Sequence, residues 1–265
     1  MRTPPTVLVI AGSDSAGGAG IQADLKSAMA NGAHATTVIT AVTAQNSLGV
    51  QGIWPVDLAG VRAQFRSVMD DIGADVIKVG MLGTLELVRE VSSLLIPYAA
   101  SVPIVVDPVC ASKHGDSLLA DEALDALRQQ VLPLATLVTP NLPEAAVLLG
   151  LQADDQLDQS RAATELVGLG AAAALVKGGH AAGDEAVDVL FDGQVFRTYG
   201  AKRSQTKHTH GTGCTLASAV AARLAAGDGL ADAVAKAKEY ISGAIDHGYA
   251  LGRGIGPVDH AWRWR

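Results

Sequence analysis

The chain contains only two cysteines, Cys110 and Cys214, among its 265 residues. Two thiols so far apart do not make the disulfide scaffold of a small secreted protein, so we expect a reduced, cytoplasmic protein. The apolar run near the N-terminus is too short for a signal peptide and lacks a small-residue cleavage pattern. Apolar runs of about 18 residues, free of charges and turn residues, are also missing, so we expect no membrane span.

Charge is scarce as well. Charged residues make up 18% of the chain and the formal net charge is -7, which argues against a nucleic-acid-binding surface. Hydrophobic residues reach 49%, ample for a buried core. The sequence shows no linker, low-complexity segment or internal repeat. We therefore predict one domain spanning residues 1–265.

Short runs rich in Val and Ile alternate with longer amphipathic runs. The predicted strands are 6–12, 35–44, 75–80, 102–108, 135–141 and 172–179. The predicted helices are 21–31, 57–72, 85–95, 121–132, 144–149 and 160–169. A hairpin turning at Asp192-Gly193 and two helices, 212–226 and 230–251, follow. This order predicts an α/β fold with a mainly parallel central sheet and helices on both of its faces.

The segments that follow the strands are rich in Gly, Pro and polar residues. They read GSDSAGGAG, TAQN, GML, DPV, TPNLPE and KGGH in chain order. In open α/β sheets the ligand lies beyond the carboxyl ends of the strands. We therefore expect these segments to assemble the functional site.

The first of them, GSDSAGGAG at 12–20, joins a strand to a helix. Gly12 and Gly17 have the spacing of a phosphate-binding P-loop, but Gly18 and Ala19 stand where Lys and Ser or Thr would be. The loop also lacks the glycine order of a dinucleotide-binding turn. It is either an ordinary turn or a loop whose backbone approaches a small ligand, with Asp24 as a polar contact one turn into the helix.

The segment THGTGC at 209–214 is a stronger candidate for anion binding. Thr209 or Thr212 can cap the following helix, while Gly211 and Gly213 let backbone amides converge on a phosphoryl group. A thiol at a helix N-terminus has a lowered pKa, so Cys214 is a candidate acceptor for a hydroxyl proton. The alternative is a cysteine that only packs beside a glycine-rich cap.

Oxygen ligands and one lysine mark the remaining strand ends. Asp107 ends one strand, and Asn141 and Glu144 have capping-box spacing at a helix start. These three side chains either hold Mg²⁺ and its waters, or the last two only cap the helix. Lys177 either offsets nucleotide phosphate charge or extends from a strand end into solvent.

Taken together, these motifs resemble a known family. The ordered set AGSDSAGGAGIQADLK, VITAVTAQNSLGV, KVGML, VVDPV, TPNLPEA, VKGGH, THGTGCTLASA and GIGPV is similar to the hydroxymethylpyrimidine/phosphomethylpyrimidine kinases of thiamine biosynthesis. The resemblance runs from residue 6 to about residue 260. It implies a ribokinase-like three-layer αβα fold, ATP and Mg²⁺ as cofactors, and a homodimer.

The resemblance also implies a reaction and a set of roles. ATP would phosphorylate the hydroxymethyl group of 4-amino-5-hydroxymethyl-2-methylpyrimidine, and then the resulting monophosphate. By matching motifs, the substrate-binding residues are Gly12, Asp24, Gln45, Met81 and Val109; the catalytic group is Cys214 with the anion-hole amides of Gly211, Thr212 and Gly213; the ATP-binding residues are Lys177, Asn141 and Thr209; and the metal-binding residues are Asp107, Asn141 and Glu144.

Two departures and two alternatives stand beside this interpretation. Segment 110–119, an expected flap, has Cys110 and His114 where relatives carry other residues, and His208 replaces a common Asn. A pyridoxal kinase is one alternative, because pyridoxal also carries a hydroxymethyl group. Gln45 favours the pyrimidine, since a carboxamide both donates and accepts hydrogen bonds. The second alternative is a ligand-binding sensor without catalysis.

Overall fold

A computed structural model describes residues 3–109, 121–152, 157–179 and 183–265. The expected flap at 110–119 lies outside these residues. Within the described ranges, every helix is too short or too polar to traverse a lipid bilayer.

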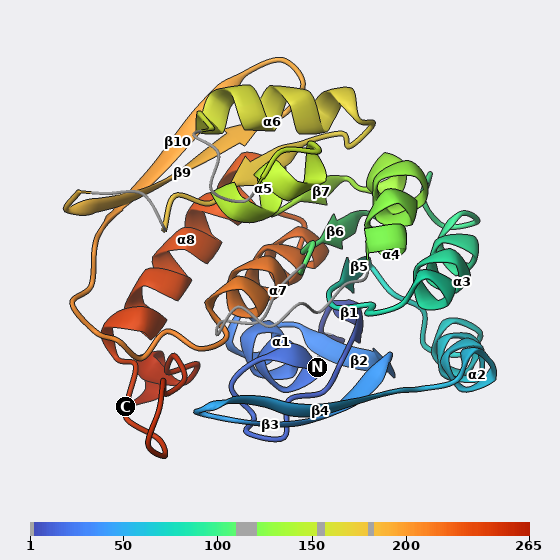
Figure 1. Ribbon diagram of the computed structural model, residues 1–265, viewed down its shortest axis with the longest axis horizontal. Helices are drawn as coiled ribbons and strands as arrows, with labels where there is room; N and C mark the ends of the chain where they lie inside the picture. Colours follow the sequence, from blue (N-terminus) through green and yellow to red (C-terminus); the bar gives the residue numbers. More distant parts are fainter. Residues whose placement is uncertain (1–2, 110–120, 153–156, 180–182) are drawn as a thin grey trace.

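A central sheet organises the described part of the chain (Figure 1). Its strand order is β10-β9-β8-β7-β6-β5-β1-β2. The strands are β1 Thr6–Ala11, β2 His34–Ile39, β5 Val76–Val79, β6 Ile104–Val106, β7 Leu137–Val138, β8 Ala174–Val176, β9 Glu185–Phe191 and β10 Phe196–Lys202. Pairings from β2 through β8 are parallel, and β9 and β10 add an antiparallel edge. The predicted mainly parallel sheet and its terminal hairpin are confirmed.

Helices cover both faces because the strand side chains alternate. Leu8 and Ile10 of β1 point into one core with α2 Leu58–Met69, α3 Leu85–Leu95, α4 Asp121–Ala126, α5 Leu142–Leu148 and α6 Gln159–Gly168. Val7 and Val9 point into the opposite core with α1 Gly20–Ala30, α7 Thr212–Ala225 and α8 Leu230–Asp246. The predicted three layers are therefore present.

The single strand predicted at 35–44 is wrong. β2 ends at Ile39, and β3 Ala41–Asn46 pairs with β4 Gly49–Pro55 in a separate two-stranded ribbon (Figure 1). Thr40 separates the two strands. Its amide donates a hydrogen bond to the carbonyl of Ala11, and its carbonyl accepts one from the amide of Val56. A continuous β-rich run hides such a change of sheet. β4 was not predicted, since its glycines and terminal proline weaken the strand pattern.

Several predicted boundaries also shift. The helix predicted over 121–132 is α4 followed by a π-turn, Leu127–Val131, and a 3₁₀ turn, Leu132–Leu134. Pro133 cannot donate an amide hydrogen bond, which disfavours continuing an α-helix there. The helix predicted over 230–251 ends at Asp246, before a glycine at 248.

Candidate active site

A cavity of about 450 Å³ lies at the carboxyl ends of the parallel strands, as the sheet topology predicts. Of the site residues named from the sequence, its walls carry all but Asp24. They are Gly12, Gln45, Met81, Asp107, Val109, Asn141, Glu144, Lys177, Thr209, Gly211, Thr212, Gly213 and Cys214. The fold thus gathers segments separated by up to about 200 residues in the sequence.

Glycine and methionine meet at one end of the cavity. A Cβ atom on Gly12 would lie 2.5 Å from Cε of Met81, so a larger residue would displace the methionine. Gln45 reaches this end from β3, and its backbone is bonded on both sides to the hydroxyl of Ser15. Backbone and apolar side chains of this kind are typical of small-molecule sites.

Asp24 does not contact this space, contrary to the sequence-based expectation. Its side chain has no exposed surface, and Oδ1 accepts hydrogen bonds from Lys78 Nζ at 2.9 Å and Ser218 Oγ at 2.6 Å. On α1 it points toward the sheet and α7 rather than the cavity. Lys78, on β5, lines the cavity in its place.

The charge of Lys78 is secured by this arrangement. Burial lowers the pKa of Lys78, but Asp24, Cys214 and Asp107 together outweigh burial and raise this pKa above the usual range. Burial also raises the pKa of Asp24, against the attraction of the ammonium group. The result is a buried ion pair that presents a lysine to the floor of the cavity.

The start of α7 is open to an anion. Its N-cap residue is Gly211, with φ of 85°, and a Cβ there would lie 1.8 Å from the carbonyl oxygen of Gly18. The expectation that Thr209 or Thr212 caps the helix is wrong, since no described side chain caps α7 and Thr212 Oγ1 donates to the carbonyl of Thr209 at 2.7 Å. Thr212 N makes a long, 3.4 Å hydrogen bond to the Thr209 carbonyl, and the amides of Gly213 and Cys214 that follow it are left for a ligand.

Cys214 lies in the first turn of α7, but its expected low pKa is not found. Burial raises the pKa of the Cys214 thiol to about 12, although the charge of Lys78 opposes this. Asp24 and Asp107 add to the rise. Desolvation of the thiolate is the largest of these effects, and the thiol is protonated at neutral pH in the ligand-free protein.

Lys177 lies between two carboxylates in the cavity wall, beside the start of α7. Its Nζ is 3.1 Å from Asp107 Oδ1 and 3.7 Å from Glu144 Oε2. Burial lowers the pKa of Lys177, but the nearby carboxylates of Asp107 and Glu144 raise it by more. The net pKa is above the usual range, so the lysine stays charged. Burial raises the pKa of Glu144, with Lys177 opposing.

Asn141 and Glu144 form a complete capping box. Asn141 N donates to Glu144 Oε2 and Glu144 N donates to Asn141 Oδ1, both at 2.8 Å. Among the described residues, no three His, Cys, Asp or Glu side chains are arranged to hold a metal ion. The carboxylates of Asp107 and Glu144 nevertheless suit Mg²⁺, which commonly binds one or two carboxylates, several waters and substrate phosphates.

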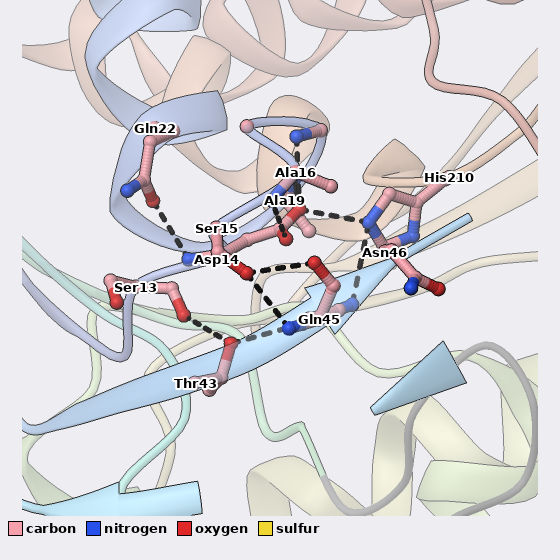
Figure 2. A network of polar contacts seen from close by, with 12 residues as sticks. Ser13, Asp14, Ser15, Ala16, Ala19, Gln22, Thr43, Gln45, Asn46 and His210 are labelled. Atoms are coloured by element: carbon pink, nitrogen blue, oxygen red, sulfur yellow. Dashed lines mark hydrogen bonds and ion pairs between the residues drawn. The ribbon is translucent and has the colours of Figure 1, made fainter. Parts of the chain in front are cut away.

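Sequence reasoning missed several charged residues of the cavity. Lys78 and Asp188 sit inside apolar strands, and Asp188 Oδ2 accepts a hydrogen bond from Lys238 at 2.8 Å. A charged residue within an apolar strand sequence could have indicated these positions, because a buried charge requires a partner of opposite charge. Asp14 and His210 come from distant loops and meet only in the folded chain (Figure 2).

The phosphomethylpyrimidine kinase family model matches residues 14–259 of this chain. The chain belongs to that family. Among curated relatives of the family, the hydroxymethylpyrimidine/phosphomethylpyrimidine kinase of Streptomyces coelicolor is 57% identical over 260 residues, covering 98% of this chain and 96% of the relative. The Bacillus subtilis protein of the same name is 41% identical, covering 96% and 93%. The resemblance inferred from the motifs is confirmed.

Solved structures also place this family member beside pyridoxal kinases. An ADP complex of Bacillus subtilis pyridoxal kinase has a TM-score of 0.91 at 37% identity, covering 99% of this chain and 100% of that chain. A phosphomethylpyrimidine kinase from Clostridium difficile has a TM-score of 0.79 at 39% identity, covering 90% and 98%. The expected α/β fold is confirmed, and the fold is common to enzymes for both ring substrates.

Proposed function

We propose that this protein uses ATP to phosphorylate the hydroxymethyl group of 4-amino-5-hydroxymethyl-2-methylpyrimidine, and then the monophosphate, in thiamine biosynthesis. One observation carries the proposal. The groups expected to bind the ring, hold the transferring phosphoryl group and offset nucleotide charge all line a single cavity. That gathering also argues against a sensor without catalysis.

The roles follow from the positions of these groups. Gln45, Gly12, Met81 and Val109 bind the ring at one end of the cavity. The amides at the start of α7 stabilise charge on the phosphoryl oxygens as the bond to the leaving group breaks. Cys214 lies beside those amides; after the thiol has released its own proton to solvent in the complex, the thiolate receives the hydroxyl proton as the new bond forms.

The ATP phosphates lie toward Lys177, with Asn141 and Thr209 nearby. Lys177 is charged and offsets part of the phosphate charge. Asp107, Asn141 and Glu144 would hold Mg²⁺ and its waters, and the ion, when bound, would neutralise further charge on the phosphates. Nucleotide binding by this fold is supported by the ADP complex of the structural neighbour.

A homodimer is part of the same proposal. The ribbon formed by β3 and β4 exposes Val42, Leu48, Ile53 and Trp54. Apolar side chains gathered on one short ribbon are typical of a surface that another protein copy covers.

Pyridoxal kinase is the second candidate, because the overall structure is at least as similar to pyridoxal kinases as to a phosphomethylpyrimidine kinase. A coupled assay with Mg·ATP decides between them. We expect turnover of the hydroxymethylpyrimidine and of its monophosphate, with ADP formed in equal amount. Turnover of pyridoxal alone would establish the second candidate, and tight ring binding without ADP formation would establish the sensor.

A further inference from the structure

The carboxylate of Asp14 joins two loops of the active site. Asp14 lies between β1 and α1 with 1% of its surface exposed, and His210 lies before α7 with 5% exposed. Asp14 Oδ2 is 2.9 Å from His210 Nε2 and also accepts hydrogen bonds from the amides of Gly18 at 2.9 Å and Ala19 at 2.8 Å (Figure 2). Oδ1 accepts from the amide of Ala16 at 2.8 Å.

These contacts determine which ring nitrogen of His210 carries hydrogen. Burial opposes ionisation of Asp14, but hydrogen bonds from His210 and the backbone amides hold the pKa of Asp14 below its usual value. An ionised carboxylate only accepts hydrogen bonds. His210 Nε2 must therefore be the protonated nitrogen. Its one hydrogen is directed at Asp14, so a second neighbour of that nitrogen can only be an acceptor that shares this hydrogen.

The side chain of Gln45 lies beside that donor. In the structure, its Nε2 lies 3.4 Å from His210 Nε2 and its Oε1 lies 3.5 Å from Thr43 Oγ1 (Figure 2). Thr43 Oγ1 already donates its hydrogen to the carbonyl of Ser13 at 2.7 Å, so it can only accept from Gln45. In that orientation the Gln45 nitrogen would face a protonated nitrogen, and its oxygen a hydroxyl with no hydrogen to give. Because the two ends of a carboxamide have nearly the same shape, we assign the reverse orientation, with the Gln45 oxygen toward His210 and its amino group toward Thr43.

The backbone of Gln45 is held separately. Ser15 Oγ donates to the Gln45 carbonyl at 2.7 Å and accepts from the Gln45 amide at 2.8 Å. Neither bond restrains rotation of the carboxamide about its own axis. His210 and Thr43 are thus the residues that distinguish the two ends of this side chain.

We propose that Asp14 and His210 are positioning residues that orient the Gln45 carboxamide and thereby make the cavity selective for a ring with an amino group beside a ring nitrogen. This deepens the proposed function and rests on it. A carboxamide accepts from such an amino group and donates to the adjacent nitrogen, as glutamine does with adenine. Pyridoxal has no amino group on its ring, so it cannot use this pair.

A purely structural clasp between the loops is the competing explanation. The loops already touch through backbone, since the carbonyl of Gly18 lies where a Cβ on Gly211 would be. Loss of a structural clasp would weaken the anion-binding turn, ATP use and both ring substrates together. Loss of the orienting donor would affect the pyrimidine selectively.

The test compares His210→Leu, which removes the donor, with His210→Gln, whose amino group can donate to both Asp14 and Gln45. Kinetics are measured for the hydroxymethylpyrimidine, pyridoxal and ATP, with melting temperature recorded for each variant. Pyridoxal serves as the second ring substrate wherever the wild type turns it over. His208→Leu is the matched control, because His208 is in the same loop and its Nδ1 bonds the amide of Gly256, yet it does not line the cavity.

We expect His210→Leu to raise KM for the pyrimidine by about tenfold or more, because the orienting bond is lost, while kcat and KM for ATP change by less than about threefold. His210→Gln should recover most of that loss, and His208→Leu should keep KM for both substrates within about twofold. Thr43→Val, which removes the other orienting group, should also raise KM for the pyrimidine.

Two results overturn the inference in distinguishable ways. A wild type that does not turn over the pyrimidine removes the proposed function and this inference with it. If the wild type does turn over the pyrimidine, but His210→Leu raises KM for the pyrimidine and for ATP equally, only the positioning role is removed. If His210→Leu does not fold, an unchanged pyrimidine KM in Thr43→Val contradicts the inference.

Discussion

At the scale of single residues, Cys214 shows how burial can reverse a local rule. A helix N-terminus favours a thiolate, yet here burial raises the pKa of the thiol to about 12. Cys214 can therefore accept the proton of the substrate hydroxyl only after its own proton has left for solvent, within the complex with substrate and ATP. A loose transition state suits this order, since the hydroxyl becomes strongly acidic only as the new bond forms.

Replacing this thiol should affect the two phosphorylations unequally. Cys214→Ser keeps the backbone amides, but we expect the rate on the hydroxymethyl group to fall by about 10²–10⁴-fold, the usual contribution of a general base. The monophosphate already carries an ionised acceptor oxygen, so its phosphorylation should fall much less. Single-turnover rates on both substrates check this. An unchanged rate on the alcohol would leave Cys214 with only a packing role.

At the scale of secondary-structure elements, one strand and two helices meet at a single buried ion pair. Lys78 comes from β5, Asp24 from α1 and Ser218 from α7, and the lysine and aspartate side chains have no exposed surface. A strand and two helices from distant parts of the chain thus meet at one carboxylate. The second oxygen of Asp24 has no hydrogen-bond partner among the described residues, so the lysine is its principal compensation.

Breaking that pair should destabilise the fold strongly. Lys78→Met leaves the buried Asp24 carboxylate unpaired, and we expect the free energy of unfolding to fall by about 3–5 kcal/mol. The double variant with Asp24→Asn removes the stranded charge and should recover a large part of that loss. Urea unfolding of the single and double variants measures both values. Losses that simply add would show that the two side chains do not stabilise each other.

At the scale of the whole molecule, the C-terminal segment closes over α7 and α8. His260 Nε2 is 2.9 Å from Thr215 Oγ1 of α7, and the His260 carbonyl accepts from Tyr240 of α8 at 2.9 Å. Burial lowers the pKa of His260 to about 4, the charge of Lys26 adds to this, and Asp259 opposes it. The native state therefore keeps this imidazole neutral.

This low pKa predicts a pH dependence of stability. The unfolded chain takes up a proton near pH 6.5 and the native His260 only near 4, so this contribution to stability is complete above about 6.5 and is lost as pH falls toward 4. Melting temperature should therefore fall over this range. In His260→Gln, which cannot titrate, the fall should be smaller. Equal slopes for the wild type and the variant would contradict the role of His260.

Local features of this protein could be predicted from its sequence. Valine-rich runs and glycine turns identified most strands and the edge that holds the ligand, because period and turn chemistry act over a few residues. The capping box of Asn141 and Glu144 was readable for the same reason. Family motifs added the substrate class and a set of site residues that, except for Asp24, all line the cavity.

Only the tertiary structure decided the contacts that depend on distant segments. It turned Asp24 away from the cavity toward Lys78, moved β3 into a second sheet, and raised the pKa of Cys214 by burying it. It also joined Asp14 to His210 across 196 positions of the chain. Side-chain direction, strand partners and desolvation are set by what packs against a residue, and a linear pattern does not contain that neighbour.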